Sequence, residues 1–164
     1  MDQIQGMEIV IFFLALATCI VAAVPGGVFG PDPWYRALPK PSWTPPDVIF
    51  PVAWTLLYLS ISAAAARLAG PLADGDARAV IALLLWTLQI VMNAVWTPLF
   101  FGARRPDLGL ALVLPFAIAV TVTSGIFAWI DPVAGALMAP YTIWVWFAAA
   151  LNAAIVHLLR GESS

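Results

Sequence analysis

Five long apolar runs joined by short polar links constrain this chain more than any other feature of its sequence. An α-helix needs about 20 consecutive apolar residues to cross a bilayer. A helix also satisfies its own backbone hydrogen bonds in lipid, and the runs lack the alternation that a membrane β-barrel needs. The sequence therefore predicts an all-α integral membrane bundle that forms a single domain over residues 1–164, with spans at residues 7–27, 45–69, 78–102, 107–130 and 133–159.

The composition agrees with a membrane protein and argues against several other classes. Of the 164 residues, 63% are hydrophobic and 10% are charged, whereas soluble domains are typically about 45–50% apolar and about 25% charged. The net charge of −2 gives no reason to expect a nucleic-acid partner. One cysteine, Cys19, and one histidine, His157, predict neither an internal disulfide nor a metal site. The sequence also shows no phosphate-binding loop and no nucleophile–base pair, so we expect no catalytic residues of these kinds.

The first apolar run has some features of a cleaved signal peptide, because residues 9–24 are apolar and end in small residues. A signal peptide begins with a positively charged segment. The residues before this run include Asp2 and Glu8 and neither Lys nor Arg. We therefore expect the first run to be a retained membrane helix.

The basic residues predict the orientation of the chain, because cytoplasmic loops carry an excess of Lys and Arg. With five spans, the side of the N-terminus receives Arg67 and Arg78. The opposite side receives Arg36, Lys40, Arg104, Arg105 and Arg160. If the protein is inserted into an inner membrane, this asymmetry predicts an outside N-terminus and a cytoplasmic C-terminus.

The first connection, residues 28–44, is rich in proline and tryptophan. Its prolines, together with Pro45 and Pro46, favour extended and stiff geometry. Trp34, Tyr35 and Trp43 lie within it. Two interpretations remain open: these rings form an aromatic belt at the membrane surface, or the segment is a semi-rigid lid over a cavity between the helices.

Polar side chains at membrane depth are costly, so their positions are informative. In the third run, Gln89 and Asn93 share a helical face with Trp86 and Trp96. Aromatic and polar residues also share faces in the second run, with Trp54 and Tyr58, and in the fifth, with Tyr141, Trp144, Ala148 and Asn152. Such faces suit a pocket for a flat, largely apolar ligand, but amides of this kind also bond neighbouring helices together. Both interpretations stay open.

Several motifs resemble those of the tryptophan-rich sensory protein (TspO) family, whose mitochondrial relatives are called translocator protein or peripheral benzodiazepine receptor. Trp34-Tyr35 followed by residues 40–46 (KPSWTPP) resembles the family's first loop, and residues 51–58 (PVAWTLLY) resemble its second helix. The third-helix match consists of Gln89, Asn93, Trp96, Pro98 and residues 100–104 (FFGAR). The fifth-helix match consists of Pro140-Tyr141, Trp144, Phe147 and Leu151-Asn152.

This resemblance implies a bacterial five-helix membrane protein that dimerises and binds porphyrins such as protoporphyrin IX and haem, with no obligatory cofactor. It implies a receptor, sensor or transporter that regulates tetrapyrrole metabolism. An enzyme that degrades protoporphyrin under light, with Trp54 and Trp144 as redox partners, is an alternative, and a scaffold without a ligand is another. The residues expected to bind the ligand are Trp34, Trp43, Ala53, Trp54, Tyr58, Gln89, Asn93, Trp96, Leu108, Ala111, Tyr141, Trp144, Ala148 and Leu151.

Within this set, we expect Trp54, Asn93, Trp144, Ala148 and Leu151 to line one cavity that is closed by the first loop. Two departures from the vertebrate relatives modify the expected ligands. The proposed sterol motif late in the fifth helix lacks its tyrosine and its basic residue in residues 151–157 (LNAAIVH), which implies weak sterol binding at most. Leu108 stands where those relatives carry a pocket tryptophan, which argues against high affinity for drug-type ligands.

The opposite face of the third run predicts where a homodimer forms. Its residues recur at steps close to the spacing of paired helices, and most are of modest size, which suits close helix contact in lipid. A stripe that simply faces lipid is the other interpretation. The stripe consists of Leu83, Thr87, Val91, Ala94 and Pro98.

Overall fold

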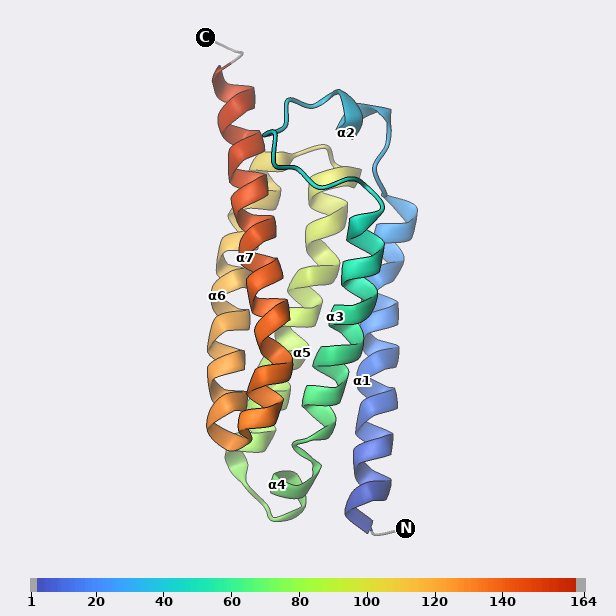
Figure 1. Ribbon diagram of the computed structural model, residues 1–164, viewed down its shortest axis with the longest axis vertical. Coiled ribbons are helices and arrows are strands. Elements are labelled where there is room, and N and C mark those ends of the chain that lie inside the picture. The colour runs from blue at the N-terminus through green and yellow to red at the C-terminus, as the bar shows by residue number, and fades with distance from the viewer. Residues whose placement is uncertain (1–2, 162–164) are drawn as a thin grey trace.

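The structure, a computed structural model, describes residues 3–161 and is built from helices (Figure 1). Five helices in this part of the chain are long and apolar enough to cross a membrane, which confirms the predicted all-α membrane bundle. The helices are α1 (Gln3–Val28), α2 (Pro33–Ala37), α3 (Ile49–Ala66), α4 (Ala69–Ala73), α5 (Ala77–Thr97), the π-helical turn η1 (Pro98–Gly102), α6 (Pro106–Ile130) and α7 (Pro132–Gly161).

The second span differs most from its expected bounds. α3 begins at Ile49, not at residue 45. Pro45 and Pro46 lack backbone N–H groups and push the residues before them toward extended geometry, so the chain becomes helical only after them. At its other end the span continues through a bend into the short helix α4. The remaining spans agree with the expected bounds to within a few residues.

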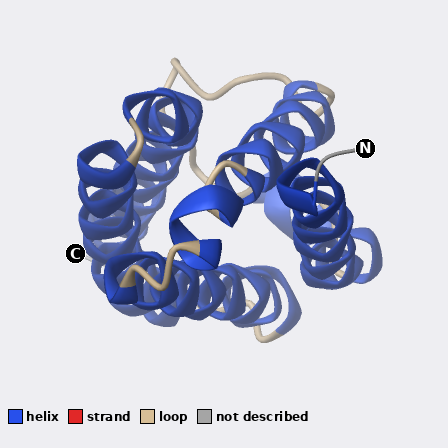
Figure 2. Ribbon diagram, turned by 90° about the horizontal axis from the view of Figure 1, so that it is seen from below, coloured by secondary structure: helices blue, strands red, loops and turns tan. Residues whose placement is uncertain are grey.

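Short links make α5, α6 and α7 antiparallel neighbours in chain order. Figure 1 shows α6 and α7 side by side, and the turn between them is a single residue, Asp131. Seen along the bundle, α1 lies at one edge (Figure 2). The N-terminal end of α1, α4 and the α6–α7 turn form one end of the bundle, here called the α4 end. The connection 29–48, here called the lid, forms the other end together with η1 and the last turns of α7.

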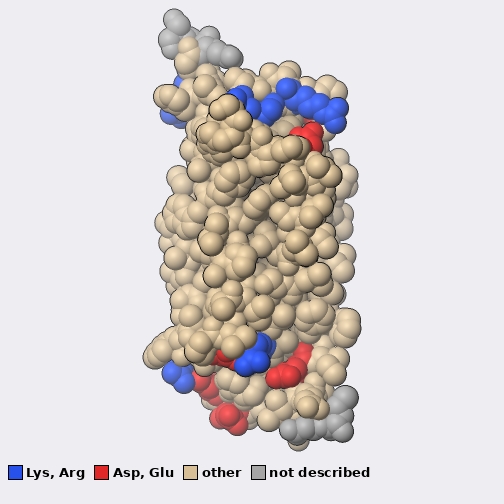
Figure 3. All heavy atoms as spheres, in the orientation of Figure 1, with Lys and Arg blue, Asp and Glu red and all other residues tan. Residues whose placement is uncertain are grey.

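Charged side chains gather at these two ends, as one face shows (Figure 3). In residues 3–161, the lid end carries the basic residues Arg36, Lys40, Arg104, Arg105 and Arg160 and the acidic residues Asp32, Asp47 and Asp107. The α4 end carries Arg67 and Arg78 with Glu8, Asp74, Asp76 and Asp131. The lid end is therefore the more positive one.

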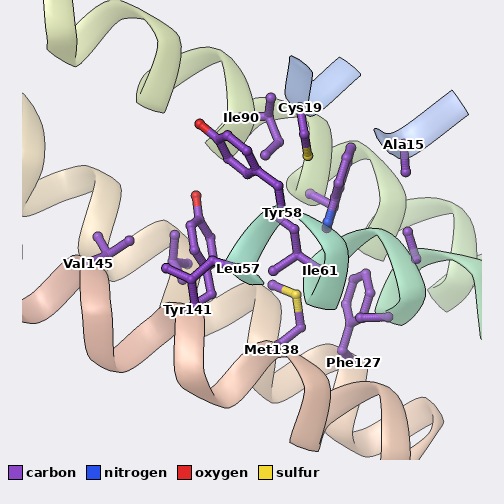
Figure 4. Packing of buried hydrophobic residues seen from close by; sticks show 14 of the residues in the cluster. Ala15, Cys19, Leu57, Tyr58, Ile61, Ile90, Phe127, Met138, Tyr141 and Val145 are labelled. Atoms are coloured by element: carbon purple, nitrogen blue, oxygen red, sulfur yellow. The ribbon is translucent and has the colours of Figure 1, made fainter. Parts of the chain in front are cut away.

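The core lies where α1, α3, α5, α6 and α7 converge (Figure 4). Ile61, Phe127, Met138 and Tyr141 are fully buried in it. α6 and α7 approach each other closely, because a Cβ added at Gly135 would lie 2.5 Å from the Cα of Ala128. Only a glycine lets two backbones pack this closely. The closely packed pair of α6 and α7 adjoins a more open part of the bundle, formed with α1 and α3, where the candidate site lies.

Candidate functional site

A cavity of about 510 Å³ lies beneath the lid. Four membrane helices enclose it, and α6 contributes none of the described residues that line it. The volume is within the usual range for small-ligand sites, about 300–1,000 Å³. Its lining residues are Ala22, Ala23, Gly26, Gly27, Phe29 and Gly30 from α1 and the start of the lid, Pro31, Tyr35, Arg36 and Asp47 from the lid, Phe50, Pro51, Trp54, Thr55 and Tyr58 from α3, Asn93, Trp96, Thr97, Phe100 and Phe101 from α5 and η1, and Ala148, Leu151, Asn152 and Ile155 from α7.

Aromatic rings form much of the wall. On α3, the rings of Trp54 and Tyr58 lie 5.3 Å apart, one helical turn from each other. On the facing side, Trp96 stacks on Phe100 at 5.1 Å. The π-helical turn places Phe100 and Phe101 together, with ring centroids 4.7 Å apart. A surface of this kind suits a flat ligand, because aromatic faces pack well against a planar apolar body.

The wall contributed by α1 is made of small residues. Gly26 and Gly27 line the cavity, and a Cβ added at either would meet no atom within 4 Å. These glycines therefore leave open space, unlike Gly135, where the added carbon would meet backbone. None of the ligand-binding residues expected from the sequence lies on α1. The cluster Gly26, Gly27 and Gly30 near the end of an apolar helix was the signal that could have indicated it.

The amides at membrane depth bond neighbouring helices, and two of them also line the cavity. The side chain of Asn93 donates to the Tyr58 hydroxyl at 2.8 Å, which links α5 to α3. Asn152 accepts from the Trp96 indole at 3.3 Å and donates to the carbonyl oxygen of Pro106 at 2.8 Å. Asn93 and Asn152 therefore bond neighbouring helices, as one interpretation expected, and they also line the cavity. They hold the cavity walls in place and present few free polar groups to a ligand.

Gln89 has a different position from Asn93, although both lie on one face of α5. Its side-chain oxygen accepts a hydrogen bond of 2.6 Å from the Tyr141 hydroxyl, and both residues are fully buried. Neither lines the cavity. This pair joins α5 to α7 in the buried interior of the bundle, away from the cavity lining.

The lid has a defined structure of its own. Asp32 caps α2 by accepting a hydrogen bond from the backbone N–H of Tyr35 at 2.9 Å, and it also pairs with Arg104 at 3.0 Å. The bond from the Tyr35 N–H, with the Arg104 guanidinium beside it, holds the pKa of the Asp32 carboxyl below its usual range. Lys40 donates to the carbonyl oxygens of Tyr35, Leu38 and Arg36 at 2.6, 2.9 and 3.1 Å. Tyr35 is buried against Phe100 and Phe101.

The structure brings part of the expected ligand-binding set together. Trp54, Tyr58, Asn93, Trp96, Ala148 and Leu151 line the cavity. Trp144 lies behind this wall, where its ring packs against Phe50 at 5.9 Å and Phe147 at 5.4 Å. Trp43 packs against Phe147 at 5.7 Å. Trp34 lies outside the lining, with its ring 6.2 Å from that of Phe100. Ala53, Leu108 and Ala111 also lie outside the cavity lining, the latter two on exposed positions of α6.

The expected dimer stripe is partly covered within the monomer. Thr87 and Val91 are exposed, whereas Leu83 and Ala94 pack against the core. The large apolar side chains of α5 that are exposed share only Val91 with this stripe. They are Val80, Ile81, Leu84, Leu88, Val91 and Val95.

The fold and the cavity define a class: a multi-pass membrane protein whose helices enclose an aromatic-walled cavity under a structured loop. Comparison with known proteins identifies the family. The model of the TspO/MBR family matches residues 12–158, and the chain belongs to this family.

Similar proteins include "Protein CrtK" of Rhodobacter capsulatus, which is 40% identical over 95% of this chain and 97% of its own length. The tryptophan-rich sensory protein of Cereibacter sphaeroides is 39% identical over 90% of both chains. The human translocator protein is 35% identical over 73% of this chain and 70% of its own length. The resemblance seen in the motifs is thereby confirmed.

Proposed function

We propose that this membrane protein binds a tetrapyrrole, such as protoporphyrin IX or haem, in the cavity beneath the lid, and that it acts as a receptor or transporter through which tetrapyrrole metabolism is regulated. The observation that carries the proposal is the cavity itself, of about 510 Å³, walled by Trp54, Trp96 and Phe100. A planar apolar macrocycle matches such a wall. Relatives named sensory protein and translocator protein agree with a receptor or transport role.

The decisive experiment is a titration of purified protein in lipid nanodiscs with protoporphyrin IX, followed by quenching of tryptophan emission. Trp54 and Trp96 line the cavity, so their emission is expected to fall in a saturable way. A matched variant, Gly27→Phe, fills open space in the α1 wall and is expected to remove the saturable phase while leaving the helical content unchanged. Quenching that rises linearly, without saturation, in the unmodified protein would end the proposal.

A light-dependent porphyrin-degrading enzyme is the second candidate. It is favoured by Trp54, which lines the cavity and whose ring lies 5.3 Å from Tyr58 and 6.1 Å from Tyr141. Such a set of close aromatic rings could pass an electron to or from an excited pigment. Illumination of the pigment complex, followed by mass spectrometry of the pigment, separates the two functions. If the bound pigment stays chemically intact, the enzyme hypothesis fails and the receptor or transporter remains.

For the orientation we infer that the lid end faces the cytoplasm, because it carries more basic residues than the α4 end. Single cysteines at position 105 and at position 74 report the two ends, and native Cys19 is buried. A membrane-impermeant thiol reagent added from outside should label Asp74→Cys and spare Arg105→Cys. Labelling of position 105 from outside would contradict this orientation.

We also propose a homodimer that meets through the exposed face of α5. Val91 belongs both to the stripe expected from the sequence and to the exposed row. Leu88→Trp places a large ring within that exposed row and is expected to weaken the dimer. Ala94→Phe, at a half-buried position that packs on the core, is expected to perturb the monomer as well. Unchanged dimerisation of the Leu88 variant in bilayers would move the interface to another helix.

A further inference from the structure

The lid contributes one cation and one anion to the described lining of the cavity, Arg36 and Asp47. Arg36 belongs to α2, and Asp47 lies just before α3. The two form an ion pair across the mouth, with 3.7 Å between Nε of Arg36 and Oδ2 of Asp47. This separation is longer than a hydrogen bond. The Arg36 side chain is 69% exposed, so its donors remain accessible.

Other basic side chains at the lid end are engaged more tightly. Lys40 donates to three backbone carbonyl oxygens of the lid. Arg104 binds Asp32 at 3.0 Å, and Arg105 binds Asp107 at 2.6 Å. These three cations do not line the cavity. Arg36 therefore differs from them both in its loose pairing and in its position.

Deeper in the cavity, the side-chain amides already donate hydrogen bonds to other groups of the protein. The Asn93 amide donates to the Tyr58 hydroxyl, and the Asn152 amide donates to the carbonyl oxygen of Pro106. A charged ligand group placed there would lose its hydration without gaining an ionic partner, which is costly. The charged part of a ligand should therefore lie at the mouth, and its apolar part among the rings.

We propose that Arg36 is the specificity-determining residue for an anionic amphipathic ligand, whose carboxylate binds the guanidinium at the mouth while its planar apolar body fills the aromatic cavity. Asp47 competes for the same guanidinium and is displaced when the ligand carboxylate binds. The guanidinium suits this role because it can bind a carboxylate through two parallel hydrogen bonds. This inference rests on the proposed function and names the ligand group that the site selects.

The test compares protoporphyrin IX, which has two carboxylates, with its dimethyl ester, which keeps the ring and loses both charges. Affinities are measured by saturable tryptophan quenching in nanodiscs. Because the Arg36 side chain is largely exposed, we expect Arg36→Gln to weaken binding of the diacid by about threefold to tenfold. Binding of the ester should not change. Asp47→Asn should strengthen binding of the diacid by about twofold to threefold and leave the ester unaffected.

Two control variants separate a specific contact from general charge. Arg105→Gln removes a cation from the same end of the bundle but not from the cavity lining, and it should leave both affinities unchanged. Arg36→Lys keeps the charge and loses the two-pronged geometry, so its affinity for the diacid should lie between those of the unmodified protein and Arg36→Gln.

Failure of this inference and failure of the proposed function give different results. If both pigments bind with equal affinity and Arg36→Gln changes neither, the inference is overturned while pigment binding stands. Equal losses of diacid and ester in Arg36→Gln would make Arg36 a structural residue of the lid and overturn it as well. If Arg105→Gln weakened binding of the diacid as much as Arg36→Gln does, Arg36 would act only through general electrostatic attraction, and the inference would be overturned. If neither pigment binds saturably, the proposed function fails, and this inference with it.

Discussion

The α6–α7 half of the bundle and the α1–α3 half use glycine for opposite purposes. At Gly135 of α7, an added Cβ would lie 2.5 Å from the Cα of Ala128 on α6. At Gly26 and Gly27 of α1, an added Cβ would meet nothing within 4 Å. The first glycine allows two backbones to pack in contact, and the other two leave open space in the cavity wall. A glycine in a membrane helix is therefore informative only together with what faces it.

The largest expected effect comes from filling the first kind of position. Gly135→Ala forces a methyl group into backbone atoms of Ala128, and overpacking of this kind typically costs about 1–3 kcal/mol. Its matched control, Gly26→Ala, enters open space in a helix and should be neutral or slightly stabilising, because alanine favours helix over glycine. Denaturant unfolding in mixed micelles measures both. Equal destabilisation by the two substitutions would break the comparison.

A second test asks whether the aromatic residues near the cavity also fall into two groups, one that faces the open space and one that only packs. Trp54 lines the cavity, whereas Trp144 packs behind it against Phe50 and Phe147. Trp54→Ala should weaken porphyrin binding by about 1–3 kcal/mol, the usual loss when a ligand-facing aromatic is truncated. Trp144→Ala should weaken it less. The titration described above measures both, and a larger loss for Trp144 would mean that the ligand lies on the α7 side of Phe50.

A smaller effect is expected from removing single hydroxyl groups, one in the packed core at Tyr141 and one at the cavity wall at Tyr58. Tyr141→Phe removes the hydrogen bond to Gln89 in the packed core and should reduce the free energy of unfolding by about 0.5–1.5 kcal/mol, with little effect on porphyrin affinity. Tyr58→Phe removes the acceptor of the Asn93 amide at the cavity wall, so it should also change porphyrin affinity. If Tyr141→Phe alone changed the affinity, the core and the site would not be separate regions.

Part of the fold and part of the candidate site could be predicted from the sequence. The five spans follow from run length, because a bilayer demands long apolar helices. The aromatic face of α3 and the Asn93 face of α5 also follow from helical periodicity. Periodicity does not report depth or the opposing surface, however, so it grouped Gln89 with Asn93 although they bond to different helices. Periodicity also gave no reason to expect that Trp54 lines the cavity while Trp144 does not. Nor did it indicate that Gly26 belongs to the cavity wall.

In the lid, too, some features could be predicted from the sequence and others could not. Its proline content predicted a stiff segment, but α2 was not expected within it. The local signal was present in the sequence: Asp32 precedes Pro33, which is an N-cap residue followed by proline at the first helical position. The Arg36–Asp47 pair could not be expected, because it depends on where the two ends of the lid return to the bundle.

The smallest expected effect concerns pH and the lid. The folded-state pKa of Asp32 is below its ordinary value of 3.8, so the stabilisation it provides is complete above that value and is lost as the pH falls through the folded-state pKa. Hydrogen exchange of α2 amides should therefore be constant from about pH 7 to 5, once corrected for intrinsic rates, and protection should fall below about pH 4. Asp32→Asn keeps a capping oxygen without a titratable charge and should abolish this pH dependence. A pH dependence that persists in this variant would assign it to another group.

The ordered lid also determines how quickly a ligand exchanges. Because Asp32 caps α2 and Lys40 ties three carbonyl oxygens together, the lid has its folded form before any ligand arrives. Binding then requires no ordering of this loop, and the affinity is not reduced by that entropy cost. A ligand that enters and leaves through the lid must wait for this ordered segment to move aside. We therefore expect slow exchange, in which association and dissociation are retarded by the same factor and the equilibrium constant is unaffected.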